Sequence, residues 1–268
     1  MPASEALNAW EALTAVRAQS PVVHNITNYV VMNTTANALL ALGASPVMAH
    51  AEEEMEDMVG ISAALVLNIG TLSREWVKAM FLAAEHATRR GIPIVLDPVG
   101  AGATRYRTGT VRDFLAAFRP AIIRGNASEI MAIRGAGAGT KGVDSLDASQ
   151  DAVSAARAIY EAHGSVVCIS GATDYIIGDR SLRIHNGHPL MTRVTGLGCT
   201  ASALCGAFAA ITPDPVLAAA QAMAVMGVCG EIAAAKADGP GTLQLHFLDA
   251  LHRLSEADIK GRLRAEVA

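Results

Sequence analysis

The chain has 268 residues, of which 51% are hydrophobic but only 4% aromatic, so its core must consist mostly of small aliphatic side chains. The formal net charge is −4, and no basic stretch interleaves with aromatic residues, which argues against nucleic acid as a partner. This length suits one large α/β domain with a deep core, and no linker or repeat divides it. We therefore expect a single domain over residues 1–268.

The chain shows no sign of export or of membrane insertion. No basic-then-apolar signal opens it, and residues 1–18 are typical of an amphipathic helix. Residues 194–213 carry no charge and match the length of a membrane span, but their glycines, threonines and serine favour a buried helix instead. The cysteines show no C-x-x-C pair, and Cys168, Cys205 and Cys229 are interpreted as small core residues. We expect a cytoplasmic protein without a membrane partner.

Short apolar runs that are typical of buried strands recur along the first two thirds of the chain. We predict them at 21–24, 44–48, 64–69, 92–96, 121–123 and 166–169. Helical patterns separate them, at 31–42, 53–61, 73–89, 111–118, 128–134 and 148–163. This alternation predicts a mostly parallel sheet covered by helices on both faces.

After residue 170 the alternation of apolar runs and helical patterns ends. Strand-like runs at 174–177, 182–185 and 189–194 are separated by Gly-Asp and Asn-Gly turns, which predicts a small antiparallel edge on the sheet. The last 70 residues are predicted to be helical. The fold class is therefore α/β.

A polar side chain follows almost every predicted parallel strand. Ligands of open α/β sheets bind beyond the carboxyl ends of the strands, so these positions are the expected site. They are Asn25, Asn68, Asp97, Arg124 with Asn126, and Ser170.

The most informative segment leads from a predicted strand through two glycines into an alanine-rich helix. Gly196 and Gly198 permit a tight turn whose N–H groups converge at the start of that helix, an arrangement that binds phosphates. Cys199 lies at the same point, where a helix N-terminus is expected to lower the pKa of a thiol. We interpret Cys199 as a group that takes a proton from a hydroxyl, beside an anion hole formed by the two glycines.

Two carboxylates and one cation complete a set that is suited to phosphoryl transfer. Asp97 leaves a buried strand toward a glycine-rich turn and is a candidate ligand of Mg²⁺ beside phosphates. Glu129 could reach metal-bound water, and Arg124 is a fixed positive charge for nucleotide phosphates. The alternative for both carboxylates is structural: Asp97 would cap a helix or a turn, and Glu129 would occupy the first turn of a helix capped by Asn126 or Ser128.

Five motifs, in this order, resemble the hydroxyethylthiazole kinase family over nearly the whole chain. They are VHNITN (23–28), ALGASPVM (41–48), LDPVGA (96–101), IRGNASEI (123–130) and VTGLGC (194–199). The last is the most specific, because related ribokinase-like kinases usually carry aspartate at the position of Cys199.

The resemblance implies a ribokinase-like fold and ATP- and Mg²⁺-dependent phosphorylation of 4-methyl-5-(2-hydroxyethyl)thiazole, a salvage step toward thiamine. Carried over by residue, it places Met48 and Gly196 on the thiazole alcohol, with Asn25 nearby. It places Arg124 and Ser170 on ATP, although family members often have threonine where this chain has Ser170.

The resemblance also implies a homotrimer with sites between subunits. Many sugar kinases of the superfamily close their site with a lid inserted early in the chain, whereas residues 25–48 pass directly from strand through helix to strand. A neighbouring subunit would then supply the missing wall.

Two other functions remain open from the sequence. One is a related pyrimidine or sugar kinase, against which Cys199 argues. The other is a non-catalytic binding protein on the same fold, against which the joint presence of Asp97, Arg124, Glu129 and Cys199 argues.

Overall fold

The predicted alternation of strands and helices builds a nine-stranded sheet in the order β2-β1-β3-β4-β5-β6-β7-β8-β9. The computed structural model describes residues 7–135 and 145–267. The strands from β2 to β6 in this order are parallel, and the three that follow pair antiparallel. The strands are β1 (Val22–Ile26), β2 (Ser45–Val47), β3 (Ala64–Asn68), β4 (Ile94–Asp97), β5 (Ile122–Asn126), β6 (Val166–Ser170), β7 (Asp174–Ile177), β8 (Ser181–Ile184) and β9 (Ala265–Val267).

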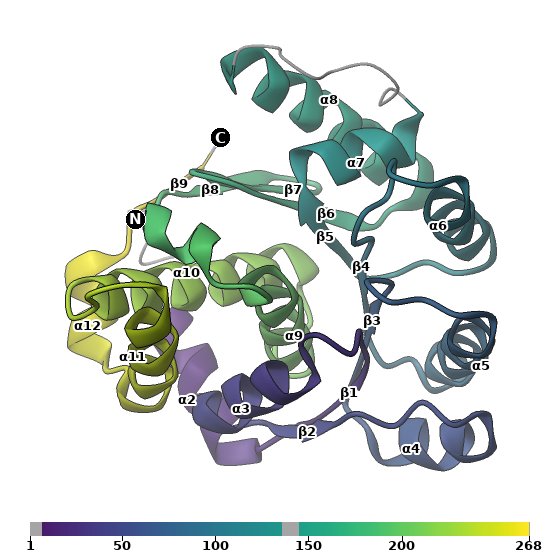
Figure 1. Cartoon of the computed structure of the whole chain (residues 1–268), viewed down its shortest axis with the longest axis horizontal. Helices are drawn as coiled ribbons and strands as arrows, with labels where there is room; N and C mark the ends of the chain where they lie inside the picture. The colour runs from purple at the N-terminus through teal and green to yellow at the C-terminus, as the bar shows by residue number, and fades with distance from the viewer. Residues whose placement is uncertain (1–6, 136–144, 268) are drawn as a thin grey trace.

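Helices cover both faces of this sheet, as predicted (Figure 1). One face carries α4 (Met55–Ile61), α5 (Arg74–Arg90), α6 (Arg105–Ala117), α7 (Ala127–Arg134) and α8 (Ser145–His163). The other carries α2 (Ala9–Gln19), α3 (Met32–Leu42), α9 (Leu197–Ala209), α10 (Pro215–Ala234), α11 (Pro240–Arg253) and α12 (Glu256–Arg262). Two short 3-10 helices complete the set: η1 (Glu52–Glu54) lies between β2 and α4, and η2 (Pro189–Arg193) lies between β8 and α9.

The apolar character of the strands follows from burial on both faces. On β3, Leu65 and Leu67 belong to the core under α4 to α8, while Val66 between them belongs to the core under α9. All three side chains are at most 1% exposed. Because successive side chains of a strand point to opposite faces, a sheet covered on both sides needs a continuous apolar run.

Helix α9 lies unusually close to the sheet. A Cβ atom on Gly206 would lie 2.5 Å from Cγ2 of Val66 and 3.1 Å from Cγ1 of Val23. Only glycine therefore allows this contact, which holds the N-terminus of α9 at the carboxyl ends of the strands.

Two predictions for the C-terminal part are wrong. Residues 189–194 contain the 3-10 helix η2 (Pro189–Arg193) and not a strand, because Pro189 lacks an N–H for a strand ladder and occupies the first helical turn, capped by His188. The third antiparallel strand is instead β9, which pairs with β8 from the end of the chain, so the last 70 residues are not all helical.

Two helix starts also differ from the prediction. Helix α6 begins at Arg105 and not at residue 111, because Thr104 caps it by accepting a hydrogen bond from the N–H of Arg107 at 3.2 Å. The predicted helix over 1–18 is observed as α2, and residues 1–6 lie outside the described residues.

The buried apolar helix expected at 194–213 corresponds to α9, and α10 is longer still. Within the described residues, α10 is the one helix long and apolar enough to cross a membrane. Most of its residues are buried inside the fold, where it packs on α9 and α11. Internal packing therefore accounts for its apolar composition.

Candidate active site

The carboxyl ends of the parallel strands bring the predicted polar side chains together. Asn68 and Asp97 are register partners at the ends of β3 and β4, and Asn126 and Ser170 are register partners at the ends of β5 and β6. Neighbouring parallel strands end at the same edge of a sheet, so residues distant in sequence meet there. The structure thus brings Asn68, Asp97, Arg124, Asn126 and Ser170 to this edge as predicted, whereas Asn25 lies outside the hollows there.

Asp97 is the most deeply buried acid of the cluster, at 1% exposure. Its Oδ2 accepts hydrogen bonds of 2.7 Å from Nδ2 of Asn68 and from the hydroxyl of Ser202 on α9. Its Oδ1 receives none from any of the described residues. Burial raises the pKa of Asp97 to about 6, although the nearby charge of Arg124 opposes that rise. An unpartnered buried carboxylate oxygen is a strong indication that a ligand completes the site.

Glu129 holds two backbone segments together. Its Oε2 accepts the N–H of Asn126 at 2.9 Å, and Asn126 in turn caps α7 by accepting the N–H of Glu129 at 3.0 Å. Its Oε1 accepts the N–H of Gly100 at 2.8 Å, in the turn after β4. The capping alternative is therefore present for Glu129, and it fixes the carboxylate beside Asp97.

The hydrogen bonds of these two carboxylates leave them able to hold Mg²⁺. Mg²⁺ is usually held by one or two carboxylates together with phosphate oxygens and water. Oδ1 of Asp97 is free to bind directly, whereas both oxygens of Glu129 already accept N–H groups, which favours contact through water. Within 7–135 and 145–267, no group of three or more His, Cys, Asp or Glu side chains could hold a metal by itself.

The predicted glycine turn directs the first N–H groups of α9 into the same space. Gly196 is the N-cap of α9 at φ +84°, and a Cβ there would lie 2.6 Å from Cγ1 of Val31. A Cβ on Gly198 would lie 2.9 Å from a guanidinium nitrogen of Arg124. Gly196 is thus required by its positive φ and its contact with Val31, and Gly198 lets the guanidinium of Arg124 lie against the turn. The N–H groups at the start of α9 form a binding place for an anion.

Cys199 lies at the start of α9 as predicted, but the expectation of a lowered pKa is wrong. Nδ2 of Asn28 donates to its Sγ at 3.5 Å. Burial, followed by the negative charge of Asp97, raises the pKa of the Cys199 thiol to about 11. Removal from water outweighs the field of the helix terminus, so the side chain is a neutral thiol at neutral pH.

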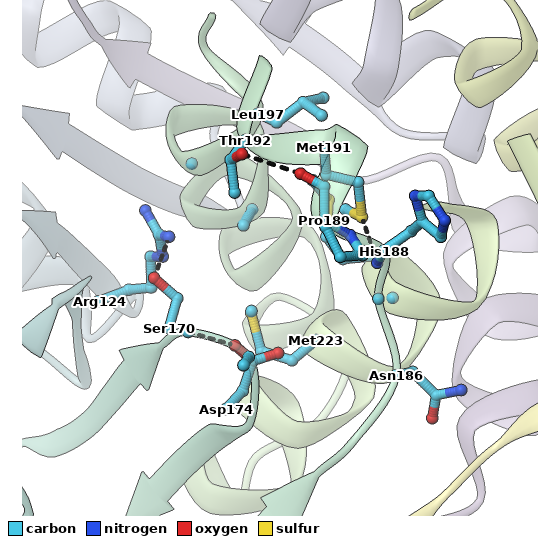
Figure 2. A pocket seen from close by; sticks show the side chains of 17 residues that line it. Arg124, Ser170, Asp174, Asn186, His188, Pro189, Met191, Thr192, Leu197 and Met223 are labelled. Carbon is cyan, nitrogen blue, oxygen red and sulfur yellow. Dashed lines mark hydrogen bonds between the residues drawn. The ribbon is translucent and has the colours of Figure 1, made fainter. Parts of the chain in front are cut away.

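Two hollows open on either side of Arg124. The larger, of about 640 Å³, contains Arg124, Ser170 and Gly198 at one end, and Figure 2 shows its lining. The smaller, of about 380 Å³, is lined by Asp97, Glu129, Gly196 and Cys199 together with loop residues. Comparison of the two sets of lining residues shows that Arg124 and Gly198 belong to both.

Arg124 is well held in this position between the hollows. Its side chain is buried, and a guanidinium nitrogen donates to the hydroxyl of Ser170. Its Nε has no partner among the described residues. A buried, permanently charged guanidinium with unused N–H donors is suited to binding phosphate oxygens. The negative charge of Asp97 lies on one side of Arg124, and a phosphate would balance the rest of its positive charge from the other side.

Two predicted substrate residues lie apart from these hollows. Asn25 is fully buried on β1, where its Nδ2 donates to the carbonyl of Val23 at 2.9 Å. Met48 is half-buried just beyond the end of the edge strand β2. Neither lines the larger or the smaller hollow of its own chain.

Sequence reasoning did not assign roles to several residues that shape the site. Asn28 contacts Cys199, Ser202 contacts Asp97, and Asp174 lines the larger hollow. Ser202 carried a usable signal, because it follows Cys199 by one helical turn on α9 and so lies on the same face. Asp174 carried none, since it begins an antiparallel strand, and only the pairing of β7 with β6 brings it to the carboxyl end of β6.

The different surroundings of the two carboxylates predict opposite effects of their substitution on metal-free protein. The folded pKa of Asp97, about 6, lies above its ordinary value of 3.8. As pH rises between these two values, ionisation of Asp97 therefore lowers the free energy of unfolding. Asp97→Asn should therefore melt at the same or a higher temperature than the parent at neutral pH. Glu129→Gln places an NH₂ group against a backbone N–H and should lose about 1 kcal/mol.

Thermal denaturation in a chelating buffer, repeated between about pH 4 and about pH 8, checks both effects, because this range covers almost all of the interval from the ordinary pKa of 3.8 to the folded pKa of about 6. The parent should gain stability from Asp97 on acidification, and Asp97→Asn should lack that gain. A lower melting temperature for Asp97→Asn than for Glu129→Gln at neutral pH would contradict this account.

Comparison with known proteins places this geometry in a family. The sequence model described as the hydroxyethylthiazole kinase family matches residues 13–257. The chain is 66% identical over 259 residues to the hydroxyethylthiazole kinase of Syntrophus aciditrophicus (strain SB), covering 96% of each.

Solved structures agree with this result. The hydroxyethylthiazole kinase protein of Pyrococcus horikoshii OT3 matches with a TM-score of 0.90 and 43% identity, over 97% of this chain and 98% of that one. A ribokinase-like superfamily protein from Enterococcus faecalis V583 matches with a TM-score of 0.61 at 13% identity, over 86% of each chain, and shows the shared fold alone. The fold is thus ribokinase-like, and the chain is a kinase that belongs to the hydroxyethylthiazole kinase family.

Proposed function

We propose that the protein transfers the γ-phosphoryl group of ATP to the hydroxyl of 4-methyl-5-(2-hydroxyethyl)thiazole, giving the thiazole monophosphate and ADP. The observation that carries this proposal is that two hollows meet at Arg124 and Gly198. A nucleotide in the larger hollow and an alcohol in the smaller one would face each other there, as in-line transfer requires. The names of the similar proteins support the identity of the alcohol, and with it a salvage role in thiamine biosynthesis.

The residues at the junction would act on the phosphates of ATP. Arg124 and Ser170 bind the phosphate chain, the first by charge and the second by its hydroxyl. The N–H groups of the turn from Gly196 to Gly198 are fixed where charge develops on the transferred group, and fixed donors stabilise such charge at no cost of reorganisation.

Asp97 and Glu129 would hold Mg²⁺ beside the phosphates. Oδ1 of Asp97, which has no partner among the described residues, would bind the ion directly, and Glu129, whose two oxygens already accept N–H groups, would bind it through water. When bound, the ion neutralises charge on the phosphate oxygens. It would also remove the cost of burying an ionised Asp97, whose pKa is raised to about 6 by burial.

Cys199 would receive the proton of the attacking hydroxyl. Its Sγ lies in the smaller hollow with the anion-binding turn, where the alcohol must sit. Because the pKa of the thiol is about 11, the base is the thiolate, which becomes more abundant as pH rises. The bond from the alcohol oxygen to phosphorus forms as the bond from phosphorus to the ADP oxygen breaks, and the hydroxyl proton passes to the sulfur.

We propose that the active form is a homotrimer with the thiazole sites between subunits. Val30, which lines the smaller hollow, is 62% exposed, and its neighbour Tyr29 is 65% exposed. Large apolar side chains around a polar site support coverage by another protein. Met48, outside both hollows of its own chain, would then contribute to the site of a neighbour, and we propose the same for Asn25.

The remaining proposals concern organisation and place. We propose that residues 1–268 act as one ribokinase-like kinase domain without a lid, since β1 leads through α3 directly to β2. We also propose that the enzyme works in the cytoplasm, where ATP is available.

The central prediction is that the purified protein with Mg²⁺ and ATP releases ADP in proportion to added thiazole alcohol. A coupled ADP assay and detection of the monophosphate measure this activity. Hydroxymethylpyrimidine and a sugar alcohol serve as control acceptors. ADP release with hydroxymethylpyrimidine but not with the thiazole would contradict the proposed substrate. Nucleotide binding without any phosphoryl transfer would favour a non-catalytic protein.

The second prediction concerns the thiol. Cys199→Ala should lower kcat by about 10²- to 10⁴-fold, the usual contribution of a general base, with little change in ATP affinity. Cys199→Asp should retain substantial activity, because a carboxylate can accept the same proton. The parent rate should rise with pH above neutrality, since the folded pKa of the thiol is about 11, and this rise should be absent in Cys199→Asp.

The matched control is Cys205→Ala, which removes a buried thiol on the same helix that lines neither hollow. It should leave kcat and its pH dependence unchanged. If Cys199→Ala turned over as fast as the parent, the thiol would be a packing residue only.

The third prediction tests the shared sites. Light scattering coupled to size exclusion should give the mass of a trimer. Met48→Arg and Cys199→Ala, each inactive alone, should recover activity when their subunits are exchanged, because roughly one quarter of the interfaces would pair two intact halves. Full activity of a monomer on dilution, or no recovery despite proven exchange, would place each site within one chain.

A further inference from the structure

The larger hollow contains several polar side chains, and most of their hydrogen-bonding groups are already used. Nδ2 of Asn186 donates to Oε1 of Glu231 at 3.1 Å and to the carbonyl of Arg262 at 2.8 Å. Its Oδ1 accepts the N–H of Arg264 at 2.7 Å. This amide therefore joins the wall of the hollow to the C-terminal segment, and both N–H donors of its Nδ2 are used.

The other polar side chains of this wall are engaged in the same way. The hydroxyl of Thr192 donates to the carbonyl of Pro189 at 2.8 Å. Nδ1 of His188 accepts the N–H of Leu190 at 3.2 Å, and the imidazole is exposed on the rim. These contacts shape the short helix η2, and none presents a charged acceptor to the interior.

Asp174 is the exception. Its side chain is 6% exposed and lines the hollow at the start of β7. Its Oδ1 accepts the N–H of Gly171 at 3.0 Å, while no described residue donates to its Oδ2. Burial raises the pKa of Asp174 to about 7, and the N–H of Gly171 only partly opposes this rise. A carboxylate oxygen that is open to the hollow and has no protein donor can accept a hydrogen bond from a ligand there.

The position of Asp174 along the hollow indicates which donor this is. The phosphate end is marked by Arg124 and Ser170, and Asp174 is tied to Gly171, the residue after Ser170. Figure 2 shows Arg124, Ser170 and Asp174 along one side of the hollow, with Pro189 and Met191 across it. The rest of the lining is apolar, with Leu197, Met223 and Met226, and suits the flat face of a nucleobase.

The group that joins the phosphates of a nucleotide to its base is the sugar, and its free hydroxyls are donors. A carboxylate is the acceptor that proteins use for ribose hydroxyls in other nucleotide sites. We propose that Oδ2 of Asp174 accepts a hydrogen bond from a ribose hydroxyl of the bound nucleotide, and that this contact makes the enzyme select ribonucleoside over deoxyribonucleoside triphosphates. The inference rests on the proposed function, since it assumes that the larger hollow holds the phosphoryl donor.

Two other roles for Asp174 make different predictions. A residue that only caps the turn at Gly171 would affect all nucleotides equally. A carboxylate that accepts the exocyclic amine of adenine would discriminate between bases and not between sugars. The ratio of activities with matched nucleotides therefore separates the three roles, and this ratio is unaffected by a general loss of folded protein.

The experiment measures kcat/KM for ATP, 2′-deoxyATP, 3′-deoxyATP and GTP at a saturating concentration of thiazole alcohol. A hydrogen bond to a charged group corresponds to roughly a 10- to 100-fold effect, so the parent should prefer ATP over one of the deoxynucleotides by that factor. Asp174→Ala should reduce this preference to near unity through a higher KM for ATP, with kcat and the ATP-to-GTP ratio little changed. Asp174→Asn keeps an acceptor for the N–H of Gly171 and should show an intermediate preference.

Ser170→Ala is the matched control, because Ser170 faces the phosphates that all four nucleotides share. It should lower kcat/KM for each by the same factor and preserve the preference for ribose. An unchanged ATP-to-deoxyATP ratio in Asp174→Ala, or a changed ATP-to-GTP ratio instead, would overturn the inference.

Direct binding keeps this test separate from the proposed function. Calorimetry with the non-hydrolysable analogues of ATP and of the deoxynucleotides reads the same ratio without any acceptor. Binding of all analogues with equal affinity by the parent would overturn the role of Asp174 alone. Absence of any nucleotide binding by the folded parent would overturn the proposed function, and the inference with it.

Discussion

The close approach of helix α9 to the parallel sheet is the constraint on which the rest of the site depends. Gly206 allows the helix to touch Val66 and Val23, and this contact sets the depth at which α9 begins. From that fixed position Gly198 lies against Arg124, and Ser202 donates to Asp97. One packing contact thus places the anion-binding turn, the buried cation and the buried acid relative to one another, because close-packed interiors transmit small changes in distance.

Burial then sets the chemistry of the groups that α9 and the strands bring together. It raises the pKa of Asp97 to about 6 and that of Cys199 to about 11. Both shifts favour the neutral form, so burial in the free site disfavours negative charge, which the phosphates of the proposed nucleotide substrate carry. Arg124 and the N–H groups at the start of α9 oppose this effect. The site is therefore one in which a bound cation and phosphate would each stabilise the other.

Most of the fold could be predicted from the sequence, because burial on both faces requires continuous apolar runs and because each parallel connection is local. The errors arise at segments whose structure does not follow from a local apolar pattern. Residues 189–194 have the composition of a strand, yet Pro189 starts a 3-10 helix. Strand β9 is specified by its pairing with β8, from which η2 and four α-helices separate it in the chain, and such a contact leaves no local signal.

The sequence by itself determined which chemical groups the site contains and which strand carries each of them, because residues at the ends of parallel strands meet at one edge of the sheet. It also determined the glycines of the turn before α9. Only the tertiary structure decided that Glu129 holds Gly100 in place, that the thiol of Cys199 is neutral, and that two hollows share Arg124. Those properties depend on distances between remote segments and on exclusion of water, and neither is encoded in any local stretch of the chain.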